Sequence, residues 1–179
     1  TDSGVSIDVL ANDRDTDGGT LSLDSASITS GDGSVSVVNG EVVVDPGQDF
    51  QDLAAGQSGQ VEISYVVSDG QGGSDTASVS VTVTGGNDGP VAVADSAGTD
   101  EDSSVSIDVL ANDSDIDGGT LSLDSASITS GDGSVSVVNG EVVFDPGQDF
   151  QDLAAGQSEQ VEISYVVSDG QGGSDTASV

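Results

Sequence analysis

Residues 135–144 read Val-Ser-Val-Val-Asn-Gly-Glu-Val-Val-Phe, and this stretch decides the fold. Asn-Gly between two runs of β-branched residues is the strongest short signal for a β-hairpin, because both turn positions need a positive φ. The stretch therefore predicts two antiparallel strands, 135–138 and 141–144, that meet in a tight turn at Asn139 and Gly140. We expect an all-β domain around this hairpin.

The neighbouring stretches alternate apolar and polar residues, as strands with one buried face do. Residues 105–109 and 161–167 carry Val, Ile or Tyr at every second position, and 121–123 alternates Leu with Ser. Residues 91–94 and, in the earlier part of the chain, 77–83 predict the first and last strands. Seven such strands in about 100 residues are typical of an immunoglobulin-like Greek-key β-sandwich.

The predicted core is mainly Val, Ile and Leu, and its large members are Phe144, Phe150 and Tyr165. Tyr165 has two interpretations, a plain core residue or a corner tyrosine whose hydroxyl bonds to the backbone. Asp-Pro at 145–146 ends a strand, so residues 145–158 are expected to form a loop with a helical turn, in which Phe150 closes one end of the sandwich.

The sequence repeats with an offset of 100 residues. Residues 1–79 and 101–179 differ at only six positions: Thr1/Glu101, Gly4/Ser104, Arg14/Ser114, Thr16/Ile116, Val44/Phe144 and Gly59/Glu159. Such fidelity predicts tandem modules of one kind, 1–86 and 87–179, joined end to end by a short linker. We expect an excerpt from a longer array, in which the first module lacks its N-terminal strand and the second lacks the end of its last strand.

The charge of the chain is extreme, with 33 acidic residues, one basic residue (Arg14), no His and no Cys. Salt bridges cannot hold such a fold together, and disulfides are absent. Nucleic acid and anionic membranes are not expected as direct partners, because no basic patch is available for phosphates. Without His, Cys or Lys there is no Ser-His pair, thiolate or Schiff-base lysine, so we do not expect an enzyme. Disorder, the alternative at such charge, is disfavoured by the alternating β-branched stretches.

The sandwich topology sorts the acidic residues between the two ends of a module. The turns near 113–117, 139–140 and 169–175 lie at the leading end, where the chain enters the module, and the remaining loops lie at the trailing end together with the end of the last strand. The leading-end candidates for metal binding are Asp113, Asp115, Asp117, Asp169 and Asp175, repeated in the first module as Asp13, Asp15, Asp17, Asp69 and Asp75. The candidates at the trailing end of the first module and in the linker are Asp2, Asp49, Asp52, Asn87 and Asp88.

Asp113, Asp115 and Asp117, followed by Gly118, have the spacing of a loop that binds a hard cation, because oxygen ligands at alternate positions converge. The loop matches only the first half of an EF-hand, since Asp124 stands where that loop has a bidentate Glu. A solvated acidic turn is the alternative, and for Asp169 and Asp175 an ordinary Asp-Gly turn is an equal alternative. A further set is expected to be solvated or to cap turns: Asp24, Asp32, Asp45 and Asp95.

Three motifs together resemble bacterial cadherin-like tandem repeats of the VCBS type, which occur in large repeats-in-toxin (RTX) adhesins. They are Val-Leu-Ala-Asn-Asp-x-Asp-x-Asp-Gly-Gly-Thr-Leu at 109–121, Tyr-Val-Val-Ser-Asp-Gly-Gln-Gly-Gly-Ser-Asp-Thr-Ala at 165–177 and Gly-Asn-Asp-Gly-Pro at 86–90. The resemblance covers the whole chain. The near-identical copies resemble the extender, or stalk, region of such adhesins, including biofilm adhesins.

The resemblance implies Ca²⁺ at the joints between modules. Asn87, Asp88 and Pro90 resemble the cadherin linker, and Asp113 with Asp115 resembles the cadherin DxD pair. Glu101, with Asp102 beside it, matches the acidic residue near the end of the first cadherin strand; Thr1 stands at this place in the first module.

Our main hypothesis is a non-catalytic extender of a secreted adhesin on a bacterial cell surface. Calcium ions would stiffen the array so that it projects a distal binding domain, and the partners would be neighbouring repeats of the same chain. We expect a monomer without direct membrane contact. The alternative is a β-sandwich module that binds a glycan or a protein through calcium.

Overall fold

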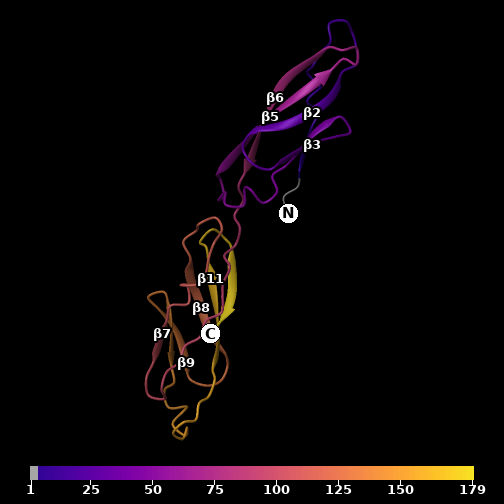
Figure 1. The fold of residues 1–179 in the computed structure, drawn as a ribbon. Coiled ribbons are helices and arrows are strands. Elements are labelled where there is room, and N and C mark those ends of the chain that lie inside the picture. The colour runs from indigo at the N-terminus through magenta and orange to yellow at the C-terminus, as the bar shows by residue number, and fades with distance from the viewer. Residues whose placement is uncertain (1–3) are drawn as a thin grey trace. The chain divides into compact units, whose positions relative to one another are not determined.

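The computed structural model describes residues 4–179, and the chain divides into two compact units, Thr1–Gly86 and Asn87–Val179 (Figure 1). The described residues form strands, turns and extended segments, without a helix. The predictions that concern Thr1 and Asp2 lie outside the described residues.

The first unit is a sandwich of two three-stranded antiparallel sheets. Its strands are β1 (Val5–Ile7), β2 (Ser22–Ser30), β3 (Ser34–Val38), β4 (Glu41–Asp45), β5 (Ser58–Ser68) and β6 (Ser74–Thr84). One sheet has the order β1-β4-β3 and the other has the order β2-β5-β6. The chain changes sheets between β1 and β2, again between β2 and β3, and a third time between β4 and β5, as the predicted Greek-key sandwich requires.

The second unit repeats this topology. Its strands are β7 (Val105–Ile107), β8 (Ser122–Ser130), β9 (Ser134–Val138), β10 (Glu141–Asp145), β11 (Glu162–Ser168) and β12 (Ser174–Ser178). The sheet orders are β7-β10-β9 and β12-β11-β8. In this second sheet β11 lies between β8 and the C-terminal strand β12, which is yellow in Figure 1.

The Asn-Gly hairpin forms in both units as predicted. Asn39 and Asn139 have φ values of 53° and 54°, and Gly40 and Gly140 have φ values of 83° and 86°. Positive φ at both central positions matches the right-handed twist of the flanking strands. The pairs Val38 with Glu41 and Val138 with Glu141 close the two hairpins.

Each unit has its own aliphatic core between the two sheets. In the second unit the buried set is Val109, Val142, Phe144, Phe150, Ile163, Tyr165 and Val167. Phe144 and Phe150 meet edge to face, with ring centroids 6.3 Å apart. The first unit buries Val9, Val42, Val44, Val61, Ile63 and Tyr65. Burial of each such side chain stabilises the fold by about 1.5–3 kcal/mol.

Several predicted elements differ from the structure. Residues 91–94 form no strand, since only one isolated bridge joins Val91 to Ser114. The predicted strand 105–109 ends at Ile107, and the strand predicted at 121–123 extends to Ser130. The segment 145–158 contains successive turns in place of the expected helical turn. Local pattern cannot set these limits, because each depends on the available pairing partner.

Candidate functional site

We call residues 87–95 the linker segment, and in the second unit it lies along two acidic loops, 113–119 and 169–175. Three backbone N–H groups of the segment donate to carboxylates of these loops. Asp88 donates to Asp117 at 2.8 Å, Ala92 donates to Asp175 at 2.9 Å, and Val93 donates to Asp113 at 2.7 Å; the carboxylates thus fix the path of the segment.

Asp169 anchors the start of the linker segment. Its Oδ2 accepts a hydrogen bond of 2.7 Å from the side-chain amide of Asn87, while its Oδ1 accepts from the N–H groups of Gln171 and Gly173. These donors, with Asn87 as the largest effect, lower the pKa of Asp169 below the ordinary value of 3.8. Asp169 as a residue is only 4% exposed, and its hydrogen-bond donors outweigh the effect of burial, which by itself would raise the pKa.

A glycine permits the close approach of the linker segment to the second acidic loop. A Cβ added to Gly173 would lie 2.8 Å from the Cα of Gly89, closer than real Cβ atoms come to a backbone carbon. The same Cβ would lie 2.2 Å from Oδ2 of Asp169, so any larger residue at 173 would displace this carboxylate as well as the segment.

The far end of the linker segment is held by Tyr165. The tyrosine hydroxyl lies 2.8 Å from the carbonyl of Val93 and 3.0 Å from Oδ2 of Asp95. Burial and the neighbouring carboxylate of Asp95 raise the pKa of Tyr165, which keeps the hydroxyl protonated as a donor. The backbone of Val91 pairs with that of Ser114, and the N–H of Asp95 donates to Ser178.

Four oxygen atoms around the linker segment are buried and have no hydrogen-bond partner. They are Asn87 Oδ1, Asp113 Oδ2, Asp115 Oδ2 and Asp117 Oδ1. A buried acceptor without a partner costs about 1–3 kcal/mol, and more when it is charged. Each of the four is an acceptor of the kind that a hard cation such as Ca²⁺ prefers. The donor atoms present are therefore of the chemical type that a calcium ion takes.

The carboxylates do not form a complete metal site as they stand. Among residues 4–179, no three acidic side chains lie close enough together to hold an ion. Asp115 Oδ1 is occupied by the N–H of Asp117 at 2.8 Å, which leaves Oδ2 for a ligand. Cation binding would thus draw the unpartnered oxygens together.

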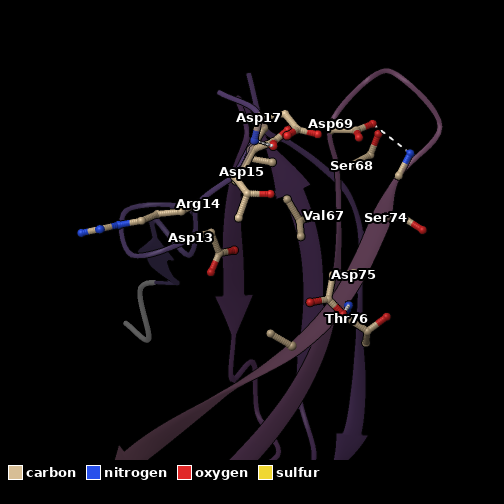
Figure 2. A pocket seen from close by; sticks show the side chains of 14 residues that line it. Asp13, Arg14, Asp15, Asp17, Val67, Ser68, Asp69, Ser74, Asp75 and Thr76 are labelled. Atoms are coloured by element: carbon tan, nitrogen blue, oxygen red, sulfur yellow. Dashed lines mark hydrogen bonds between the residues drawn. The ribbon is translucent and has the colours of Figure 1, made fainter. Parts of the chain in front are cut away.

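In the first unit, the counterparts of these acidic residues line an open cavity of about 370 Å³ (Figure 2). Its walls include the acidic residues Asp13, Asp15, Asp17, Asp69 and Asp75. Asp17 and Asp75 are exposed here, whereas Asp117 and Asp175 are half-buried beneath the linker segment. None of the described oxygens of the first-unit loops is both buried and unpartnered.

The remaining candidates from the sequence lie away from these loops. Asp49 Oδ2 accepts from the N–H of Gly33 at 3.0 Å, and Asp52 is exposed. In the second unit, Gln151 Nε2 donates to the carbonyl of Glu101 and to Oδ1 of Asp102.

The sequence predictions missed two contributors to the linker-segment contacts, Asp95 and Asn112. Asp95, expected to be solvated or to cap a local turn, binds Tyr165 instead. Asn112 Nδ2 donates to the carbonyls of Val93 and Ala94. The ring of Tyr165 is core, as predicted, but its hydroxyl bonds to the carbonyl of Val93, 72 residues upstream, and not to nearby backbone as in a tyrosine corner. A buried tyrosine needs a hydroxyl partner, and this was the one available signal.

Comparison with known families identifies the architecture. Residues 87–179 match the bacterial Ig domain family, and residues 1–84 match the cadherin-like domain family. The chain belongs to the bacterial Ig domain family. Ig-like and cadherin-like sandwiches are typically non-catalytic, tandem and structural, and they are typical of extracellular or surface proteins.

Comparisons with curated proteins and with solved structures do not extend this family assignment. No curated protein matches the chain. An endo-fucoidan hydrolase, MfFcnA4 from glycoside hydrolase family 107, has a TM-score of 0.37 and 16% identity over 99% of this chain and 25% of that enzyme. A variant of the same enzyme has a TM-score of 0.35 and 17% identity. The chain thus spans a quarter of those proteins, and likeness at this level does not bear on function. Residues 4–179 include no helix that is long and apolar enough to cross a bilayer.

Proposed function

We propose that this chain is a non-catalytic extender of a bacterial surface adhesin, stiffened by calcium at the joint between its modules. The observation that carries the proposal is the set of four buried, unpartnered oxygens of Asn87, Asp113, Asp115 and Asp117. Calcium takes oxygen ligands from carboxylates and amides, and Asn87 supplies a ligand from the linker itself. Cadherin-like domains commonly bind calcium, and residues 1–84, the repeat that precedes this site, match that family.

The linker contacts explain how an ion stiffens the array. The N–H of Gly85 donates to Gln57 of the first unit at 2.9 Å, and Asn87 is bonded to Asp169 of the second unit. Only Gly86 lies between these two anchors, so the free length of chain is one residue. An ion bound to Asn87 holds the second anchor in place. Without it, repulsion between the carboxylates of the acidic loops would loosen the anchor.

Calcium titration calorimetry of matched variants tests this proposal. Asp115→Ala removes an unpartnered oxygen, whereas Asp15→Ala removes its counterpart in the loop without a linker segment. We expect Asp115→Ala to weaken the tightest calcium binding by at least about tenfold, the effect of roughly 1.4 kcal/mol, and Asp15→Ala to leave it unchanged. Equal effects of the two substitutions would contradict the proposed site.

Small-angle X-ray scattering tests the extender role separately. Addition of millimolar calcium is expected to narrow the distribution of radii of gyration, because the joint loses its freedom. Magnesium, which is smaller and prefers rigid octahedral coordination, serves as the control ion. The same broad ensemble in chelator and in calcium would exclude a stiffening role even if the ion binds.

A further inference from the structure

The linker segment is held by two sets of contacts that differ in chemistry. Residues 87–88, which we call the tip, donate hydrogen bonds to the carboxylates of Asp169 and Asp117. Asn87 Oδ1 and Asp117 Oδ1 are also among the buried oxygens without a partner. The contacts of the tip therefore depend on carboxylates that repel one another in the absence of a cation.

Residues 91–95, which we call the clamped stretch, are held at both ends by backbone hydrogen bonds. Val91 and Ser114 exchange two of them, at 2.7 Å and 3.1 Å. The N–H of Asp95 donates to the carbonyl of Ser178 at 2.9 Å. None of these three bonds involves a carboxylate, so repulsion between the acidic loops does not act on them directly.

Two side chains hold the middle of the clamped stretch. The Tyr165 hydroxyl lies 2.8 Å from the carbonyl of Val93 and 3.0 Å from Oδ2 of Asp95, and the Asn112 amide donates to the same carbonyl at 3.2 Å. The side chain of Val93 is 44% exposed, so hydrogen bonds fix this part of the chain more than apolar burial does. Tyr165 is fully buried in the core, and this burial fixes the position of its hydroxyl.

We propose that Tyr165 and Asn112 are positioning residues that keep the clamped stretch seated with or without calcium, and so confine the hinge of the joint to residues 86–89. The inference rests on the proposed calcium-stiffened joint and states what stays ordered when the ion leaves. Pro90 ends the hinge, because it is buried and its ring fixes φ. Without the clamp, the free chain would extend toward β7, which begins at Val105.

The clamp also makes calcium binding less costly in conformational entropy. The carboxylates of Asp175 and Asp113 accept from the N–H groups of Ala92 and Val93, so the seated stretch holds both acidic loops beside the tip. An arriving ion then has to order only the hinge. Preorganisation of this kind raises affinity, because less freedom is lost on binding.

Amide hydrogen exchange of the intact chain in chelator tests the clamp without any ion. After correction for intrinsic rates, we expect Val93 and Asp95 to be protected and Asp88, in the tip, to exchange faster. Tyr165→Phe removes the hydroxyl and keeps the ring, and it should accelerate exchange at Val93 and Asp95 by about five- to tenfold. The rate at Val143, in the core strand β10, should stay unchanged, which separates loss of the clamp from general destabilisation.

Tyr65→Phe is the matched control, because the hydroxyl of Tyr65 makes no contact with the linker segment. It reaches the carbonyl of Val9 and Asp13 Oδ2 only at 3.4 Å. This substitution should leave exchange in the clamped stretch unchanged. Equal effects of the two substitutions on the clamped stretch would overturn the proposal, and so would equal exchange of the tip and the clamped stretch in chelator.

Repetition of the measurement in calcium separates the clamp from the proposed ion site. Calcium is expected to slow exchange at Asp88 and to leave Val93 nearly as it was in chelator. A protected Val93 beside a fast Asp88 in chelator supports the clamp, whatever calcium does. Exchange at Asp88 that does not respond to calcium would contradict the ion site and leave the clamp standing.

Discussion

Identical residues have different environments in the two modules, and this is clearest at single side chains. Asp69 and Asp169 both accept from the backbone of an Asp-Gly turn, but only Asp169 accepts from an asparagine of the linker segment. The neighbouring sequence is the same, so the difference arises from residues that are distant in the chain. The local motif alone therefore does not show the hydrogen bond from Asn87.

The pKa of Asp169 should depend on Asn87. Asn87→Ala removes the largest cause of its lowered pKa, so the value should rise toward that of Asp69, which keeps the backbone donors. Carboxyl carbon-13 NMR against pH measures both groups at once, with Asp69 as the internal control. A value for Asp169 that stays unchanged in the variant would contradict the hydrogen bond.

Acid should release the linker segment. Because the pKa of Asp169 is lowered by folding, its stabilising effect is present above the ordinary value of 3.8 and is lost as the pH falls through the lower value of the folded state. Asp175, whose pKa is lowered chiefly by the N–H of Ala92, acts in the same direction. Amide hydrogen exchange at Ala92 should accelerate, relative to Val43 in a core strand, below about pH 3.8. Uniform exchange changes would contradict this.

Two of the six differences between the modules are coupled by packing. A Cβ on Gly59 would lie 2.6 Å from a ring carbon of Phe50, whereas the second module carries Glu159 and pairs Phe150 with Phe144. Gly59→Glu should therefore destabilise the first module by about 1–3 kcal/mol. Val44→Phe in the same chain should recover part of that loss. Urea unfolding of the double-mutant cycle checks this, and simple additivity would contradict the coupling.

At the scale of elements, the hairpins were predictable because their turn chemistry is local. The conformation of residues 91–94 was not predictable. Their apolar alternation is that of a strand, but the N–H groups of Ala92 and Val93 donate to carboxylates and not to a neighbouring strand. Likewise the spacing of Asp113, Asp115 and Asp117 indicated a cation loop, but Asn112 and Asp95 could not be placed without the folded linker segment. Sequence pattern identifies faces and turns; it does not identify long-range partners.

Backbone strain at Gly40 should by itself destabilise the hairpin turn. Gly40 has a φ of 83° and no atom within 4 Å of an added Cβ, so Gly40→Ala introduces strain without a clash. We expect a loss of about 1–2 kcal/mol. Ser36→Ala on β3 is a control that leaves the turn intact. Equal stability of Gly40→Ala and the parent in urea unfolding would contradict the positive φ.

For the whole molecule, the main electrostatic property is the net charge of −32, which makes repulsion between carboxylates general. With one basic side chain, stability has to come from aliphatic cores and backbone hydrogen bonds, to which we propose that bound cations add. The unpartnered oxygens in the second unit are the place where we propose that such a cation binds. Sodium chloride, which screens charges in general, should raise the melting temperature gradually, with a smaller rise once calcium is bound.

The most direct test of the central claim is thermal unfolding by circular dichroism in chelator, in magnesium and in millimolar calcium. An ion at one hundred times its dissociation constant stabilises the fold by about 2.7 kcal/mol, which for a small domain is a rise of roughly 10–20 °C in melting temperature. We predict this rise in calcium and not in magnesium, and its loss in Asp115→Ala. The same melting curve in all three buffers would show that the acidic loops are a solvated coat, and would contradict a calcium-stiffened extender.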